Sequence, residues 1–299
     1  MTGNSIEYLL GIDGGGTKTE FLLTDINGRE INRLVLGCSN PVNEGIERTL
    51  AILDDGIRNI CSDIKYSRIS LFAGIAGAKT NNNCMLISDY LSRYGFSFSD
   101  VDSDISLALE TALGDSNGSI LIIGTGIVGV ARCDDGLHIV GGKGYMIDKG
   151  GSGYHFGSDA LNCAFEYLDG RGGSKLILSL AEKELSKDLL SSLGDIYKGG
   201  ACLVASFASI VFEAAEKGDN CALEIIERNA KEIAKIINAL QRITEAPNNY
   251  TVISGGLCKQ KEIIHPVIQK YLNSEARVSY LEKPMVYGAV SLAKKQIKE

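Results

Sequence analysis

The stretch GIDGGGTKTEFLLTD, which begins at Gly11, sets one aspartate, Asp13, beside a run of glycines between two apolar segments. It is close to the phosphate-loop pattern G-x-x-x-x-G-K-[ST], but Thr17 stands where that pattern needs its lysine. Gly15 and Gly16 would permit positive φ angles and let backbone N–H groups approach an oxygen anion. Thr17 adds a hydroxyl donor and Lys18 a positive charge, so the turn is interpreted as a phosphate site.

Asp13 is the unusual member of this turn, because a carboxylate repels phosphates unless a divalent cation lies between them. Mg²⁺ would resolve this conflict, which makes Asp13 the expected metal ligand. The alternative is a tight hairpin in which the aspartate only caps the turn.

Two further glycine turns follow apolar strands. Gly124, Thr125 and Gly126 form a Gly-Thr-Gly turn that is weak by itself, because three small residues can make any hairpin. In ISGGLC, Gly255 and Gly256 lie between a strand and a helix, which suits close approach of a nucleotide's base or ribose. A plain strand-to-helix turn explains that segment equally well.

Asp104 begins a predicted helix after a strand, in VDSDIS. It could be an N-cap, or a general base that accepts the proton of a substrate hydroxyl during phosphoryl transfer. Asp102 competes for the second role. Two residues apart on a strand point to the same face, so spacing does not choose between them.

An internal repeat organises the chain. Residues 7–31 read as a three-stranded antiparallel meander, and residues 119–140 repeat the same order of strands and glycine turns. Two halves that each begin with a glycine hairpin would place two anion-binding turns across a shared cleft.

The remaining segments are predicted to be helices and strands. The first half predicts helices over 43–64, 82–95 and 104–113, with strands over 69–77 and near 97–104. The second half predicts mainly helix over 154–245, strands over 249–256 and 276–281, a helix from about Lys259 and a terminal helix from Pro284. We therefore expect domains of 1–115 and 116–283, with 284–299 packing on the first.

Bulk composition narrows the classes of function. The 299 residues are 44% apolar and 22% charged, with a formal charge of −7, which disfavours nucleic acid or an anionic membrane as partner. The apolar stretches are short and the N-terminus lacks a leader pattern, so we expect a cytoplasmic protein. The eight cysteines form no C-x-x-C pair and the three histidines are dispersed, so neither a zinc site nor a disulfide framework is expected.

A family resemblance emerges from the motifs taken together. GIDGGGTKTEFLLTD, SNPVNEG, FAGIAGA, SDISLAL, GTGIVGVAR, GSGYHFG, AAEKGDNCA and ISGGL occur in this order over nearly the whole chain. They resemble the BadF/BadG/BcrA/BcrD ATPase family, and within it the N-acetylglucosamine kinases and related amino-sugar kinases. The resemblance implies an α/β, duplicated ribonuclease-H-like (actin-like ATPase) fold in which two domains close on ATP and Mg²⁺. It also implies transfer of phosphate to an amino sugar such as N-acetylglucosamine, N-acetylmuramic acid or glucosamine, usually at the 6-OH.

Site residues carry over by position. Asp13 would lie near the metal, the phosphates would bind at Gly15 to Lys18 and Gly124 to Gly126, and Gly255 and Gly256 would flank the adenosine. Asp104 would be the base. The sugar would face Asn40, Asp104, Thr125, Gly142 and Lys149. Homodimers are common among such proteins, although no residue pattern here demonstrates one.

One loop departs from the pattern. The sugar kinases lead us to expect GGWGYLLGDEGSGY, whereas this chain has GGKGYMIDKGGSGY, with Lys143 in place of the aromatic residue and Lys149-Gly150 in place of the acidic pair. One hypothesis is that a lysine suits an acidic ligand, such as the lactyl carboxylate of N-acetylmuramic acid. The alternative is that both lysines are solvated loop charges.

Two other functions stay open from the sequence. The same family includes ATPases that activate a dehydratase or reductase through a shared iron–sulfur cluster, but the cysteine segment typical of that class is missing. Cys133 and Cys163 are the only pair in the corresponding region. A non-catalytic ATP- or sugar-binding regulator is the other alternative, favoured by the altered loop and disfavoured by Asp104.

Overall fold

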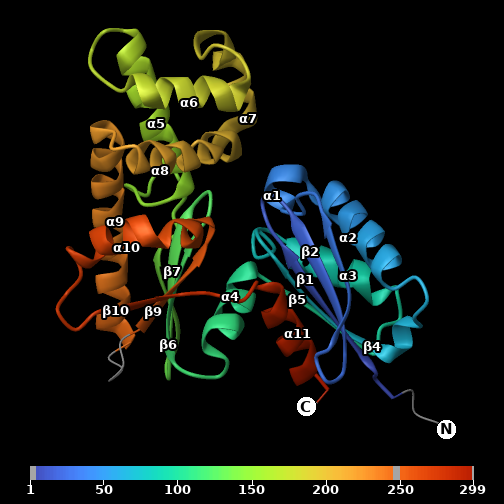
Figure 1. Ribbon diagram of the computed structural model, residues 1–299. Helices are drawn as coiled ribbons and strands as arrows, with labels where there is room; N and C mark the ends of the chain where they lie inside the picture. The colour runs from blue at the N-terminus through green and yellow to red at the C-terminus, as the bar shows by residue number, and fades with distance from the viewer. Residues whose placement is uncertain (1–4, 245–249, 298–299) are drawn as a thin grey trace. The chain divides into compact units, whose positions relative to one another are not determined.

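The computed structural model describes residues 5–244 and 250–297, which form two compact units (Figure 1). Unit 1 contains the chain up to Asp115 together with the segment from Glu282 onward, and unit 2 contains Ser116–Leu281. Each unit is built on one five-stranded sheet.

The sheet of unit 1 has the strand order β3-β2-β1-β4-β5, in which β1 is antiparallel to β2 and parallel to β4. Its strands are β1 (Tyr8–Gly14), β2 (Thr19–Asp25), β3 (Glu30–Leu36), β4 (Ile69–Ile75) and β5 (Phe98–Asp102). Its helices are α1 (Pro41–Glu44), α2 (Ile46–Ile60), η1 (Tyr66–Arg68), α3 (Asn83–Ser92), α4 (Asp104–Leu113) and α11 (Val286–Lys295).

Side-chain alternation divides unit 1 into two cores, because successive residues of a strand face opposite sides of the sheet. Leu10 and Ile12 of β1 pack in one core with Ile57 of α2. Leu9 packs in the other core with Val286 of α11. With both faces covered, β4 is buried along its whole length, and its sequence ISLFAGI reads as a continuous apolar run.

Small residues let α11 approach the sheet and α4 closely. A Cβ added to Gly11 would lie 2.8 Å from the carbonyl oxygen of Val286, and one added to Gly288 would lie 2.5 Å from that of Leu107. Any side chain at these two positions would therefore separate α11 from β1 or from α4.

The sheet of unit 2 has the order β10-β9-β6-β7-β8, which repeats the pattern of unit 1 with β6, β7 and β8 in the places of β1, β2 and β3. Its strands are β6 (Gly118–Ile123), β7 (Ile127–Cys133), β8 (Gly136–Gly141), β9 (Tyr250–Gly255) and β10 (Arg277–Tyr280). Its helices are α5 (Gly153–Leu168), α6 (Lys175–Leu185), η2 (Leu190–Ser192), α7 (Leu193–Ser206), α8 (Ala208–Glu216), α9 (Asn220–Thr244), η3 (Gly256–Gln260) and α10 (Lys261–Gln269).

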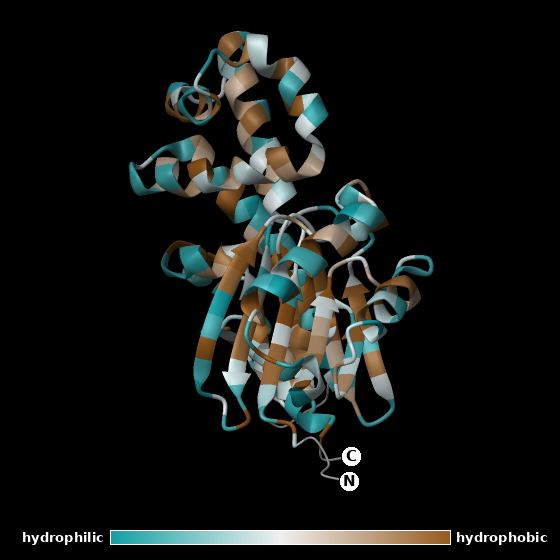
Figure 2. Cartoon of the chain, turned by 90° about the vertical axis from the view of Figure 1, so that its right-hand side faces the viewer, coloured by the Kyte–Doolittle hydropathy of each residue, from teal (hydrophilic) through white to brown (hydrophobic). Residues whose placement is uncertain are grey.

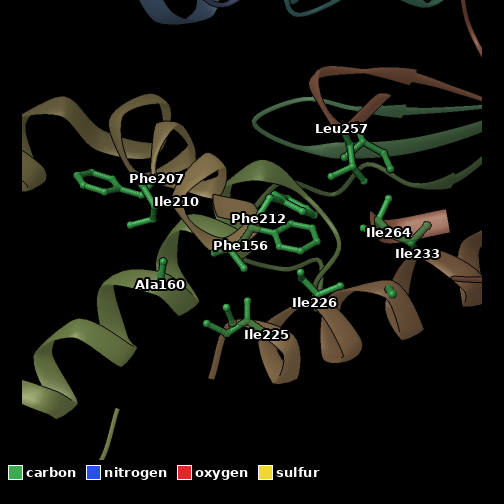
Figure 3. Close-up of a cluster of buried hydrophobic side chains, with 14 of the residues drawn as sticks. Phe156, Ala160, Phe207, Ile210, Phe212, Ile225, Ile226, Ile233, Leu257 and Ile264 are labelled. Atoms are coloured by element: carbon green, nitrogen blue, oxygen red, sulfur yellow. The ribbon is translucent and has the colours of Figure 1, made fainter. Parts of the chain in front are cut away.

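The main core of unit 2 joins this sheet to its helices (Figure 3). The ring centroids of Phe156 on α5 and Phe212 on α8 lie 5.2 Å apart, and both rings pack in the same core as Ile225 and Ile226 of α9. In Figure 2 the strands are coloured mainly as hydrophobic, whereas the helices alternate in hydropathy along their length, as expected for helices that cover a buried sheet.

No single described helix is both long and apolar enough to cross a bilayer. Two consecutive helical segments, Leu190–Ser206 and Ala208–Glu216, are long and apolar enough only when taken together, and a bend of 47° separates them. These segments contribute Ile196, Ile210 and Phe212 to the buried core of unit 2, which accounts for their apolar character.

The structure confirms the two repeated meanders and the duplicated α/β fold. Helix starts differ slightly from those expected. The helix expected from about Lys259 is a 3-10 turn up to Gln260 and becomes α-helical at Lys261, and the terminal helix begins at Val286 rather than Pro284. Glu245 and Asn249, at the ends of two predicted elements, lie outside the described residues.

Candidate active site

The candidate site of unit 1 lies where its parallel strands end. β1, β4 and β5 run in the same direction, and Asp13, Gly74 and Asp102 occupy one row across them. The chain leaves β1 into the glycine turn and leaves β5 into α4, whose first residue is Asp104. The fold therefore brings Asp13, the turn and Asp104 to one edge of the sheet, the usual location of ligands in α/β proteins.

The glycine turn closes without the positive φ angles expected from its sequence. None of Gly14, Gly15 and Gly16 has a positive φ, because the hairpin closes through a hydrogen bond of 2.9 Å from the Gly15 N–H to the Lys18 carbonyl. Gly14 is required for a different reason, since a Cβ there would lie 2.4 Å from both Ile75 and Ser39. Gly16 and Thr17 are partly or fully exposed at the tip, where their N–H groups can reach a ligand.

Asn40 lies beside this turn. The preceding Ser39 N–H donates to the Gly15 carbonyl at 3.4 Å, which ties the two loops together. Asn40 caps α1, and its Oδ1 accepts from the Val42 N–H at 2.9 Å. A Cβ on Gly77 would lie 2.5 Å from that same oxygen. Since the cap uses only the carbonyl oxygen, the Asn40 amide nitrogen is left to donate to a ligand.

Asp13 lies in an environment that disfavours the ionised form of its carboxyl group. Desolvation by burial raises the pKa of its carboxyl to about 7, with further increases from the negative charges of Asp104 and Glu20 and an opposing effect from Lys18. Glu20 lies directly opposite Asp13 in the β1–β2 pair. An ionised Asp13 therefore lacks sufficient compensating positive charge within the protein itself.

Asp102 and Asp104 differ in their hydrogen bonds. Asp102 accepts from the Ser103 N–H at 2.7 Å, from the Ser106 hydroxyl and from Lys79 at 2.8 Å. Burial raises its pKa, but these bonds outweigh that effect and hold the pKa below its usual value. Burial raises the pKa of Asp104, which backbone hydrogen bonds only partly oppose.

The structure also corrects two expectations about this pair. Ser103, not Asp104, is the N-cap of α4, so Asp104 is the first helical residue. Asp102 is the last residue of β5, and the chain turns into α4 directly after it. The two carboxylates therefore do not share a strand face. Oδ1 of Asp104 accepts from the backbone N–H of Ile105 at 3.1 Å, whereas Asp102 is also held by the side chains of Ser106 and Lys79.

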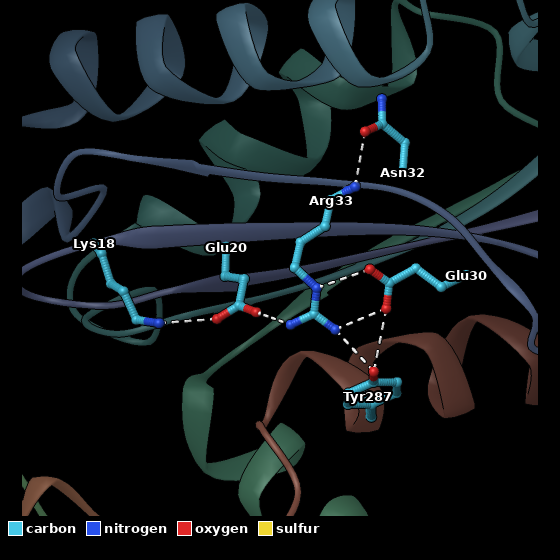
Figure 4. A network of polar contacts seen from close by, with 6 residues as sticks. All are labelled: Lys18, Glu20, Glu30, Asn32, Arg33 and Tyr287. Atoms are coloured by element: carbon cyan, nitrogen blue, oxygen red, sulfur yellow. Dashed lines mark hydrogen bonds and ion pairs between the residues drawn. The ribbon is translucent and has the colours of Figure 1, made fainter.

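A polar network behind the turn was not predicted from the sequence (Figure 4). Buried Glu20 accepts from Lys18 at 2.9 Å and from Arg33 at 2.6 Å, and Arg33 also binds Glu30 and the Tyr287 hydroxyl of α11. Lys18 is thus held beside the turn by a carboxylate that is itself fixed by Arg33. The direct pairing of Asp13 with Glu20 follows from hairpin register, which single residue types do not reveal.

Gly74 sets the distance between α4 and the sheet. A Cβ there would lie 2.2 Å from Cγ of buried Leu107. We expect Gly74→Ala to destabilise the protein by about 1–3 kcal/mol, because the clash can be relieved only by shifting α4, which carries Asp104. Thermal unfolding of Gly74→Ala and Gly194→Ala checks this, since Gly194 is helical with no atom near a Cβ. Equal midpoints for both variants would contradict the expectation.

In unit 2, the Gly124–Gly126 turn and Gly255 lie at the same end of the sheet. Ile123, just before the turn, pairs with Gly255 across β6 and β9. A Cβ on Gly255, which has a φ of 104°, would lie 2.1 Å from the Ile123 carbonyl oxygen, so this position requires glycine. The start of α5 fixes the turn, since the Gly153 N–H donates to the Gly124 carbonyl at 2.8 Å. Gly256 opens η3 with open space around it.

Gly142 and Lys149 lie in the loop after β8. The Gly142 N–H donates to the Ile127 carbonyl at 3.0 Å, one residue beyond the Gly-Thr-Gly turn. Asp148 closes the loop on itself by accepting from the Lys143 and Gly144 N–H groups. Lys149 lines a cavity of about 320 Å³ together with Glu232 and Lys235 of α9. Both Lys143 and Lys149 are exposed.

Comparisons with known proteins cover almost the whole chain. A model of the BadF/BadG/BcrA/BcrD ATPase family matches residues 10–290. An N-acetylmuramic acid/N-acetylglucosamine kinase from Clostridium acetobutylicum is 25% identical over 97% of this chain and 99% of its own length. An N-acetyl-D-glucosamine kinase from Dictyostelium discoideum is 26% identical over 97% of this chain and 98% of its own.

Solved structures share the fold. A candidate N-acetylglucosamine kinase from Chromobacterium violaceum superposes with a TM-score of 0.78 at 22% identity, over 96% of this chain and 99% of that one. A ROK family glucokinase from Streptomyces griseus, in complex with glucose and AMPPNP, has a TM-score of 0.67 at 16% identity, over 98% and 100%. These relatives are in keeping with the predicted sugar kinase. The chain belongs to the BadF/BadG/BcrA/BcrD ATPase family and has its duplicated actin-like ATPase fold.

Proposed function

We propose that this protein transfers the γ-phosphoryl group of ATP to a hydroxyl of an amino sugar, in the cytoplasm. Three groups that support this proposal lie together at one edge of the unit 1 sheet. These are the glycine turn after β1, the Asp13 carboxylate with its raised pKa beside that turn, and a second carboxylate, Asp104, at the start of α4. The names of the relatives support an amino sugar as acceptor.

Asp13 fits the role of a magnesium ligand. Its carboxylate is partly buried at a strand end, near the negative charges of Asp104 and Glu20. Mg²⁺ is commonly bound through one or two carboxylates and the phosphates of a nucleotide, and when bound it would neutralise charge on the phosphate oxygens. A buried carboxylate without enough positive charge around it has a raised pKa, as Asp13 does here. A bound cation would supply that positive charge.

In the proposed reaction, Asp104 accepts the proton of the sugar hydroxyl as its oxygen forms a bond to the γ-phosphorus. The bond between that phosphorus and the β,γ-bridging oxygen breaks, and ADP leaves. The raised pKa of Asp104 makes it a stronger base than an ordinary carboxylate. Asn40 donates to the sugar through its free amide nitrogen, and Gly15 to Lys18 bind the β- and γ-phosphates.

We assign the nucleotide contacts of unit 2 to its glycine turns. Gly124, Thr125 and Gly126 would donate to phosphate oxygens, and Gly255 and Gly256 would leave room for the adenosine, since a Cβ at Gly124, Gly126 or Gly256 has no close neighbour.

The dehydratase-activator alternative is less well supported. It requires thiolates to ligate an iron–sulfur cluster. Burial raises the pKa of the Cys163 thiol to about 12, and this side chain packs in the core of unit 2. A thiol in that environment is a poor source of a thiolate ligand.

The proposal is tested by measuring ADP release with N-acetylglucosamine, N-acetylmuramic acid, glucosamine and glucose, each with and without Mg²⁺. We expect magnesium-dependent turnover that at least one amino sugar stimulates more than glucose does. ATP hydrolysis at one rate whichever sugar is added would contradict a sugar kinase.

Lys149 is proposed to favour an acidic acceptor, because its ammonium group is exposed on the cavity that it lines, whose other lysine, Lys235, is paired with Glu232 at 2.6 Å. We expect Lys149→Ala to lower kcat/KM for N-acetylmuramic acid about fivefold to tenfold relative to N-acetylglucosamine, as for the loss of one partly exposed ion pair of about 1 kcal/mol. Lys143→Ala, in the same loop but outside that cavity, is the matched control. An unchanged ratio in Lys149→Ala would remove this role.

A further inference from the structure

The β7–β8 hairpin of unit 2 carries a group of side chains that the proposed reaction does not use. Cys133 ends β7, Asp135 lies in the connection, and His138 lies on β8. A sulfur, a carboxylate oxygen and a ring nitrogen from these residues all lie within 4.8 Å of one another. The Nε2 of His138 is 2.8 Å from Oδ1 of Asp135.

Hairpin register explains this grouping. Ala131 pairs with His138 and Cys133 pairs with Gly136. Cys133 and His138 are therefore diagonal neighbours on one face of the hairpin, since residues two apart on a strand share a face. The connection between β7 and β8 is only two residues long, so Asp135 stays close to both strands. Each of the three side chains comes from a backbone position that the antiparallel ladder or its turn fixes.

We propose that Cys133, Asp135 and His138 form a zinc-binding site. Thiolate, imidazole and carboxylate are the three donor types that Zn²⁺ accepts in proteins, whereas Mg²⁺ and Ca²⁺ prefer oxygen alone. In a tetrahedral zinc site the donor atoms lie roughly 3.3–3.7 Å apart, so the present arrangement needs only small side-chain rotations. Water would complete the fourth position.

The surroundings also favour a cation. The Cys133 thiol donates at 3.7 Å to the carbonyl of Ile243, in the last turn of α9. The C-terminal end of a helix carries partial negative charge, here from a helix of 25 residues whose last turn also contains the positive Arg242. Asp134 adds a second carboxylate at the turn and is held by Asn117 at 2.5 Å. On binding, zinc replaces the thiol proton, which leaves to solvent, and no electron is transferred.

The position of this group separates it from the proposed reaction. It lies at the end of β7, whereas the Gly-Thr-Gly turn precedes the start of the same strand. Seven strand residues separate them by about 20 Å. We therefore expect zinc to stabilise unit 2 without changing phosphoryl transfer, and the inference does not rest on the proposed function.

Titration of the full-length reduced protein with Co²⁺, followed by displacement with Zn²⁺, tests the site. A cysteine-ligated tetrahedral cobalt site gives intense visible bands and a thiolate-to-cobalt charge-transfer band in the near ultraviolet. We expect one equivalent of bound cobalt with both signals. Cys133→Ser should abolish the charge-transfer band, and His138→Ala should weaken binding at least about tenfold.

Cys221→Ser and His265→Ala are the matched controls, because both residues are half-buried in unit 2 but outside this group, and both should keep the cobalt spectrum. Circular dichroism of the metal-free variants shows whether each one folds. Zinc should raise the thermal midpoint of the wild type and not that of Cys133→Ser. The absence of a charge-transfer band in the wild type, or its persistence in Cys133→Ser, would overturn the proposal.

Discussion

Asp104→Asn is expected to lower kcat about a thousandfold with little change in the KM for ATP. The amide keeps the size and the polar contact of the side chain at the start of α4 but cannot accept the hydroxyl proton. Steady-state assays with the best acceptor from the sugar panel measure the effect. Since Asp104 approaches the sugar rather than the nucleotide in this proposal, binding of ATP should be nearly unchanged in calorimetry.

Asp102→Asn is the matched control for this result. Asp102 accepts hydrogen bonds from Ser103 and Ser106 and pairs with Lys79, so its replacement should reduce thermal stability and lower kcat less than about tenfold. A larger loss of kcat in Asp102→Asn than in Asp104→Asn would transfer the role of base to Asp102. An active Asp104→Asn enzyme would remove Asp104 from the chemistry altogether.

Asp13→Asn is expected to increase the stability of the protein at pH 8 and to abolish most of its activity. In the folded protein the Asp13 pKa is about 7, above its ordinary value of 3.8, so the folded state holds this proton more tightly than the unfolded state. The resulting stability is fully present below about pH 4 and is lost as the pH rises towards 7. At pH 8 without Mg²⁺, the asparagine variant should therefore be more stable than wild type, by about 1–3 kcal/mol.

The same substitution should abolish most magnesium-dependent turnover, because the neutral amide is a poor ligand for Mg²⁺. Thermal unfolding in EDTA at pH 4 and pH 8, together with kinetics at pH 8, measures both effects. Glu20→Gln is a useful comparison, since it removes one of the charges that raise the Asp13 pKa while leaving Asp13 in place. A variant that is destabilised at pH 8 and still active would contradict the assignment of Asp13.

The sequence predicted the fold well where local patterns were strong. The alternation along β1 to β3 and along β6 to β8, separated by glycine turns, predicted both antiparallel meanders. Apolar runs predicted β4 and β9, which lie inside their sheets. The duplication followed because the same order of patterns occurred twice.

The candidate site was harder to predict because it depends on register and on close packing. The glycine run suggested positive φ angles, but Gly14 is needed instead for contact with Ile75 and Ser39, which lie far away in sequence. The spacing of Asp102 and Asp104 does not distinguish their roles, because it does not show that β5 ends at Asp102. The Asp13–Glu20 pairing requires the hairpin register.

The Cys133, Asp135 and His138 group shows the same limit. No C-x-x-C pair or cluster of histidines marks this group in the sequence, because each donor type contributes a single residue. Only the two-residue connection and the register of β7 with β8 bring the three together.

The most direct test of phosphoryl transfer is proton-coupled ³¹P NMR of the products formed from ATP, Mg²⁺ and N-acetylglucosamine or N-acetylmuramic acid. The proposal predicts a new sugar phosphate ester in an amount equal to the ADP formed. Transfer to the 6-OH would split its signal into a triplet through the two protons on C6. Formation of ADP with inorganic phosphate as the only other phosphorus product, and unmodified sugar, would contradict the account.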